Sequence, residues 1–112
     1  MTMNMSTRDV GDVLAIDIAG KLDTNTSDAA LDELLLLLRE SPEQVLINLG
    51  PLEFVSSAGL RVILRAAKRI RGYSGRLKVA GASGPVKEVL EISGFDSLLD
   101  LYESEQQAIE SF

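Results

Sequence analysis

Two adjacent serines, Ser56 and Ser57, carry the hydroxyl groups of this sequence that are best placed for chemistry. They stand between a buried apolar segment and a helical pattern, where a serine side chain can accept a hydrogen bond from an exposed backbone N–H. Ala58 and Gly59 follow them and are small, so the helix start stays open to approach. Because helix N-termini favour negative charge, phosphorylation of Ser57 would add about two charges where the fold tolerates them. On local physics alone, simple capping explains both serines better, since capping serines are common.

The sequence lacks the residues on which common enzymatic sites depend. It contains no cysteine and no histidine, which removes thiolate nucleophiles, most zinc sites and every Ser-His arrangement. It has neither a GxSxG elbow nor a GxxxxGKS/T phosphate loop. We therefore predict a non-enzymatic protein without a metal site or a cofactor.

Charge is distributed unevenly along the chain. The formal net charge is −6, which disfavours general binding to nucleic acid or anionic lipid. Seven of the eleven Lys and Arg residues nevertheless fall between positions 61 and 78, where no Asp or Glu occurs. Arg61, Arg65, Lys68 and Arg69 occupy one helical face, which is either a solvated face or a surface complementary to an acidic patch on a partner.

The elements that position the serines follow from apolar periodicity. Val45–Leu49 is a nearly continuous apolar run, typical of a central strand covered on both faces. The pattern from Ala58 predicts an amphipathic helix that ends near Gly72. The remaining elements are strands over 3–8 and 13–19, a helix between the capping residues 24–28 and Pro42, a strand over 77–80, a helix from Pro85 to Gly94, a strand over 98–102 and a helix over 105–112.

Alternating strands and helices predict one α/β domain over residues 1–112. We expect a mixed, mostly parallel sheet of about four to five strands with about four helices packed on it. The first eight residues are polar, and no apolar run nears membrane-spanning length, so we expect a cytoplasmic protein without membrane insertion.

Four blocks of the sequence, in order, resemble successive blocks of STAS domains, the family of anti-sigma factor antagonists. They are GKLDTNT at 20–26, VLINLGPLEFVSSAGLRVIL at 45–64, LKVAGAS at 77–83 and LEISGFDSLLDLYES at 90–104. With the opening strands they span nearly the whole chain. The resemblance implies the STAS fold and a protein without catalysis of its own.

The resemblance also implies a partner and a switch. In this family, the protein binds a kinase-type anti-sigma factor and releases the sigma factor that the kinase holds, which regulates transcription indirectly. The kinase phosphorylates a serine at the start of the second long helix, which switches the protein off, and a serine phosphatase removes the phosphate. Ser57 matches that phosphoacceptor, with Ser56 as second choice. We expect the free protein to be a monomer.

The resemblance implies further site residues and shows two departures. Asp23 matches an acidic residue near the family's phosphorylation site, although a turn or cap carboxylate explains it equally well. Ser56 replaces the Asp usual before the acceptor, and Asn48 replaces an Asp common in the preceding strand. The expected partner-binding residues are Asp23, Thr24, Ser56, Ser57, Ala58, Gly59, Arg61 and Arg65. The alternative function is a scaffold or transport-associated STAS subunit that binds an ATPase partner without phosphotransfer.

Overall fold

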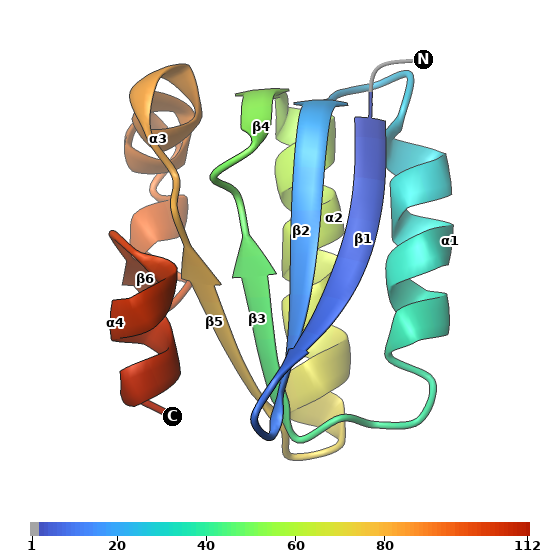
Figure 1. The fold of residues 1–112 in the computed structure, drawn as a ribbon. Helices are drawn as coiled ribbons and strands as arrows, with labels where there is room; N and C mark the ends of the chain where they lie inside the picture. The colour runs from blue at the N-terminus through green and yellow to red at the C-terminus, as the bar shows by residue number, and fades with distance from the viewer. Residues whose placement is uncertain (1–2) are drawn as a thin grey trace.

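A mixed six-stranded sheet forms the centre of the computed structural model, which describes residues 3–112 (Figure 1). The sheet order is β1-β2-β3-β5-β6, and β4 pairs with β2 beyond the end of β3. β1 runs antiparallel to β2, and every other pairing is parallel. The elements are β1 Met3–Val10, β2 Val13–Leu22, α1 Ser27–Leu37, β3 Gln44–Asn48, β4 Leu52–Val55, α2 Ser57–Gly72, β5 Arg76–Ala80, α3 Gly84–Ile92, a 3-10 turn Phe95–Ser97, β6 Leu101–Tyr102 and α4 Glu105–Glu110.

The predicted α/β class and the mostly parallel sheet are confirmed, with one strand more than expected. The additional strand is β4, in the segment 50–55 for which the sequence predicts no regular element. Leu52 and Val55 are buried while the two residues between them are exposed. Burial therefore does not alternate along β4 as it does in a typical half-buried strand, and periodicity does not predict this strand. It pairs because β2 is ten residues long and extends past β3, which leaves its last residues open to a second partner. No helix in the described part of the chain is both long and apolar enough to cross a membrane.

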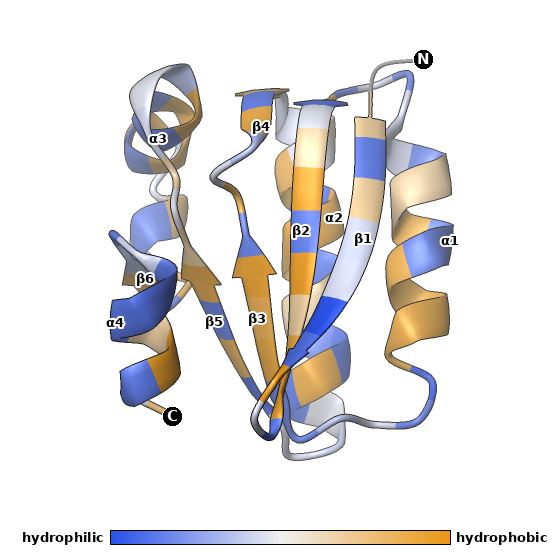
Figure 2. Ribbon diagram, viewed as in Figure 1, coloured by the Kyte–Doolittle hydropathy of each residue, from blue (hydrophilic) through white to orange (hydrophobic). Residues whose placement is uncertain are grey.

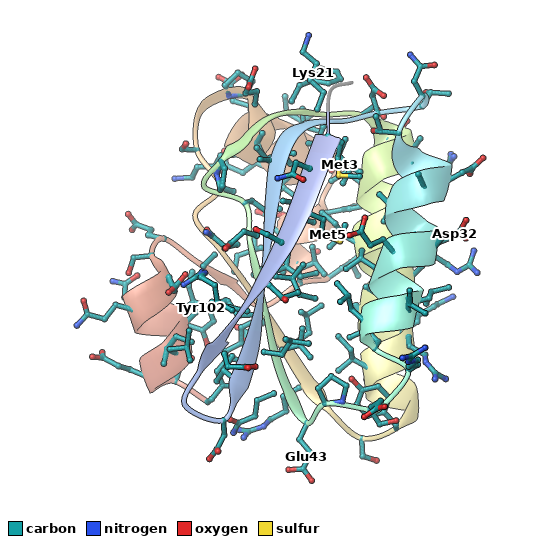
Figure 3. All side chains as sticks on the ribbon, turned by 45° about the vertical axis from the view of Figure 1, so that its right-hand side comes forward. Met3, Met5, Lys21, Asp32, Glu43 and Tyr102 are labelled. Atoms are coloured by element: carbon teal, nitrogen blue, oxygen red, sulfur yellow. The ribbon has the colours of Figure 1, made fainter. Side chains whose placement is uncertain are left out.

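Both faces of the sheet are covered, but unequally. The larger core lies between the sheet and the apolar faces of α1, α2 and α3 (Figure 2). Met3 and Met5 of β1 point toward α1 and close this core at the sheet edge (Figure 3). On the opposite face, α4 covers a smaller cluster around Ala15, Leu46 and Ala108. The layered packing holds α2 against the ends of β2 and β4, where the paired serines begin the helix.

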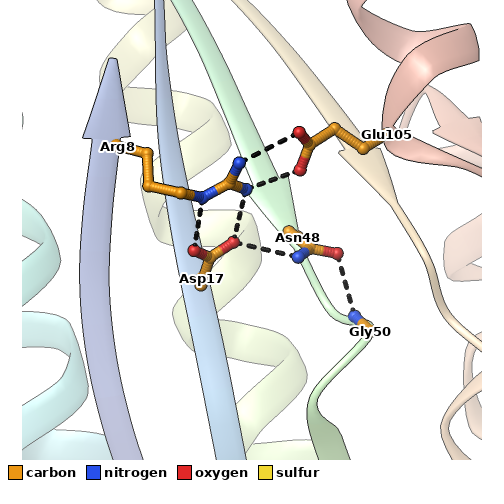
Figure 4. Close-up of polar contacts among 5 residues, drawn as sticks. All are labelled: Arg8, Asp17, Asn48, Gly50 and Glu105. Atoms are coloured by element: carbon orange, nitrogen blue, oxygen red, sulfur yellow. Dashed lines mark hydrogen bonds and ion pairs between the residues drawn. The ribbon is translucent and has the colours of Figure 1, made fainter. Parts of the chain in front are cut away.

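A polar network ties α4 to the sheet on this second face (Figure 4). Arg8 donates to both carboxylate oxygens of Asp17, at 2.7 and 2.8 Å, and to both of Glu105, at 3.0 and 2.5 Å. Asn48 donates to Asp17 at 2.9 Å and accepts from the Gly50 N–H at 3.0 Å. Hydrogen bonds from the Arg8 guanidinium hold the pKa of the Asp17 and Glu105 carboxyls below their ordinary values.

Replacing Arg8 with methionine is expected to lower the free energy of unfolding at neutral pH by about 1 kcal/mol, because the network is partly exposed to solvent. Both carboxyls have lowered pKa values in the folded state, so their contribution is present above the ordinary values of 3.8 and 4.5 and is lost as pH falls through the lowered values. The difference between parent and variant should therefore shrink in acid. Urea unfolding across pH measures it, with Arg39→Met, an exposed arginine, as the control. A difference independent of pH would contradict the network's role.

Candidate functional site

The two serines at the start of α2 differ in what their hydroxyls do. Ser56 has an extended backbone and is the N-cap, and its Oγ accepts the Gly59 N–H at 3.3 Å. The Ser56 N–H donates to the Leu22 carbonyl at the end of β2, at 3.0 Å. Ser57 is the first helical residue and is exposed, and its hydroxyl forms no hydrogen bond within residues 3–112. Capping therefore occupies Ser56 and leaves the Ser57 hydroxyl free.

Gly59 sets how closely α2 approaches the sheet. A Cβ atom at this position would lie 2.4 Å from the Leu22 carbonyl oxygen and 2.9 Å from Cγ2 of Val55. The first turn of the helix thus packs directly on the last residues of β2 and β4. Gly59 is buried beneath the first turn of α2, so it supports the exposed residues around Ser57 without being exposed itself. Ala58 is partly exposed beside Ser57.

Asp23 and Thr24 lie beside the serines, because Leu22 is hydrogen-bonded to Ser56 and the chain continues directly into Asp23. The Asp23 carboxylate accepts the backbone N–H groups of Asn25 at 2.9 Å and Thr26 at 3.2 Å. This carboxylate therefore organises the turn before α1, as one of the two interpretations of the sequence expected. It remains partly exposed, and Thr24 is exposed.

Arg61 and Arg65 extend the exposed surface around Ser57 along α2. Both side chains are exposed, and neither forms a salt bridge with a carboxylate of the described residues. The buried face of the helix, which includes Leu60, Ile63 and Ile70, is separate from them. The first turn of α2 thus joins an uncharged serine pair to a basic face.

Asn48, one of the two departures from the family pattern, has a structural explanation. Its side chain lies in the Arg8 network, on the face of the sheet opposite α2 (Figure 4). An aspartate here would bring a second carboxylate against Asp17 and would lose the donated hydrogen bond. The amide satisfies both neighbours, because it donates to Asp17 and accepts from Gly50.

Phe54 is an exposed apolar residue that the sequence did not single out. It lies on β4, three residues before Ser57, and 42% of its surface is accessible. In the register of β2 and β4 it pairs with Lys21, which is also exposed. In the sequence, Phe54 stands beside Val55 and two positions after Leu52, so it resembles a core residue, and only the pairing of β4 shows that it faces outward. No group of three or more metal-binding side chains occurs in the part of the chain that the structure describes.

Comparison with known proteins agrees with this architecture. The STAS domain family matches residues 4–108. The putative anti-sigma factor antagonist BtrV of Bordetella bronchiseptica is 31% identical over 110 residues, which cover 98% of this chain and 95% of BtrV. The anti-sigma F factor antagonist of Paenibacillus polymyxa is 33% identical over 100 residues, covering 87% of this chain and 84% of that protein.

A solved structure shares the fold at lower sequence identity. The crystal structure of an anti-sigma factor antagonist from Mycobacterium paratuberculosis superimposes with a TM-score of 0.90 at 20% identity, over 98% of this chain and 93% of that one. The family match, the two relatives and the order of strands and helices agree over nearly the whole chain. The chain therefore belongs to the STAS domain family.

Proposed function

We propose that this protein is an anti-sigma factor antagonist that binds a kinase-type anti-sigma factor and is switched off by phosphorylation of Ser57. The observation that carries the proposal is the difference between the serines: Ser56 caps α2, while the Ser57 hydroxyl is exposed and free of hydrogen bonds within the described residues. The names of the two relatives support the antagonist role. The protein itself needs no catalytic group, because the partner supplies the ATP and the active site.

The switch would work by changing charge at a fixed helix start. The partner transfers the γ-phosphoryl group of ATP to Ser57 Oγ: an O–P bond forms, the bond to the β-phosphate oxygen breaks, ADP leaves, and the hydroxyl proton is released. In the free domain, the phosphate would lie beside the backbone N–H groups of the first turn of α2 and the positive end of its dipole. On docking, the same dianion would have to lose water, which opposes the complex. A serine phosphatase would reverse the change by hydrolysis.

The partner surface in this proposal consists of exposed or partly exposed groups around Ser57. Asp23 and Thr24 lie on one side, and Arg61 and Arg65 extend it along α2. The remaining members are Ser56 and Ala58, with Gly59 underneath. Acting on transcription would place the protein in the cytoplasm, where we expect it to be a monomer when free.

Phosphorylation by the cognate kinase tests the assignment. Ser57→Ala is expected to abolish phosphate incorporation, because it removes the acceptor oxygen. Ser56→Ala is the matched control: it is expected to keep incorporation while lowering the free energy of unfolding by about 1 kcal/mol through loss of the cap. Mass spectrometry of the modified peptide identifies the site. Incorporation that persists in Ser57→Ala and disappears in Ser56→Ala would reverse the assignment.

A second candidate function is a scaffold that binds an ATPase partner through the same surface without phosphotransfer. It is supported by Ser56, which stands where the family usually has Asp. The same assay separates the two functions. Tight binding of the ATPase with no incorporation in the parent protein supports the scaffold, whereas incorporation at Ser57 supports the switch.

A further inference from the structure

A groove between α1 and α2 lies farther along α2 than the Ser57 surface. It encloses a volume of about 600 Å³. Its lining combines three cations with apolar and aromatic groups: Leu35, Arg65, Lys68, Arg69, Gly72 and Tyr73. Nothing in the phosphorylation switch requires these groups to gather in one place.

The groove carries three cations close together on α2. Arg65, Lys68 and Arg69 are exposed, and none of them forms a salt bridge with a carboxylate in residues 3–112. They stand three and four positions apart on α2, a spacing at which like charges repel and destabilise a helix. In a chain of net charge −6, this is a locally positive surface whose cations form no salt bridge within residues 3–112. An external carboxylate would relieve the repulsion.

Leu35 and Tyr73 add apolar and aromatic surface to the charged groove. Leu35 is partly buried between the two helices, and the Tyr73 hydroxyl donates to the Pro42 carbonyl at 2.7 Å, which fixes the ring. Apolar surface and cations therefore share one concave site. This combination fits a protein segment that carries both carboxylates and an apolar side chain better than it fits a polyphosphate, which offers nothing for the apolar part.

We propose that this groove docks an acidic segment of the anti-sigma factor that also contacts Ser57. Arg61 and Arg65 connect the two places along one face of α2, so a single partner can cover both. The inference rests on the proposed function. It adds a second contact that steers and orients the partner while taking no part in phosphotransfer.

Charge reversal in the groove tests the proposal with the full-length partner kinase. The variant Lys68→Glu/Arg69→Glu, which leaves Arg65 of the Ser57 surface intact, is expected to slow association at low salt about tenfold, because steering by complementary charge is lost. At high salt, the association rates of the parent and the variant should become nearly equal, because salt screens the charges. The matched control is Arg71→Glu, an exposed arginine on the same helix that does not line the groove. A neutral variant with glutamine at positions 68 and 69 serves if the reversal impairs folding.

Phosphotransfer supplies a second measurement. The groove variant should raise KM for phosphorylation of Ser57 while kcat stays unchanged, since the acceptor is intact. Hydrogen exchange on the partner should show a protected acidic segment that loses protection with the variant.

The outcomes separate the two proposals. If the parent binds the kinase and the variant associates equally fast at every salt concentration, the groove inference fails and the proposed function stands. If the parent does not bind at all, both fail. Binding of duplex DNA or phosphatidylserine vesicles that depends on the groove, with unchanged kinase association, would assign the groove to a different ligand and overturn the inference.

Discussion

Replacing Gly59 with alanine is expected to destabilise the domain by about 3 kcal/mol, although alanine is the better helix former. The new Cβ would lie 2.4 Å from the Leu22 carbonyl oxygen and 2.8 Å from Leu22 Cγ. Neither neighbour is the end of a flexible side chain, so α2 itself must shift away from β2. The gain in helix propensity from Gly to Ala is only about 1 kcal/mol and does not offset this shift. Because Ser57 begins the same turn, its position relative to Asp23 would change as well.

Chemical denaturation measures the loss, and α2 offers a matched control. Gly72 lies at the other end of the helix and is exposed, and a Cβ there would meet nothing within 4 Å. Gly72→Ala should therefore leave stability unchanged or raise it slightly. If Gly59→Ala is as stable as the parent, α2 cannot pack as closely on β2 as the position of Gly59 indicates.

The sequence predicted the elements with strong periodicity and missed those that depend on tertiary pairing. The strand around Val45–Leu49 and the helix after Ser57 follow from apolar patterns that local sequence contains. β4 does not, because its pairing exists only where β2 extends past β3. The outward position of Phe54 depends on that pairing and could not be predicted either.

The candidate site shows the same division. The sequence placed two serines at a helix start, but it could not say which hydroxyl the cap uses, because that depends on the backbone angles of Ser56. The sequence alone also could not explain why position 48 is Asn rather than Asp. Its partner Asp17 is 31 residues away, and Arg8 and Glu105, which complete the network, are separated by 97. No local pattern connects residues at such separations.

Ser57→Glu is expected to weaken binding to the kinase about a hundredfold, which corresponds to about 2.7 kcal/mol. The carboxylate places a charge at the first helical position, where the free domain accommodates it because the helix dipole favours negative charge. Thermal stability should therefore be unchanged or slightly higher. In the complex, the same charge must lose its water, and this cost lowers affinity. Affinity thus falls without a loss of stability, which a merely misfolded variant cannot imitate.

Calorimetric titration with the kinase measures this effect, and Ser57→Gln separates charge from size. Glutamine has nearly the shape of glutamate without its charge, so it should lose much less affinity than Ser57→Glu. Equal losses in the two variants would show that the surface around Ser57 rejects bulk rather than charge. A Ser57→Glu variant that binds as tightly as the parent would exclude Ser57 from the contact, because an exposed hydroxyl in the interface cannot gain a charge without cost.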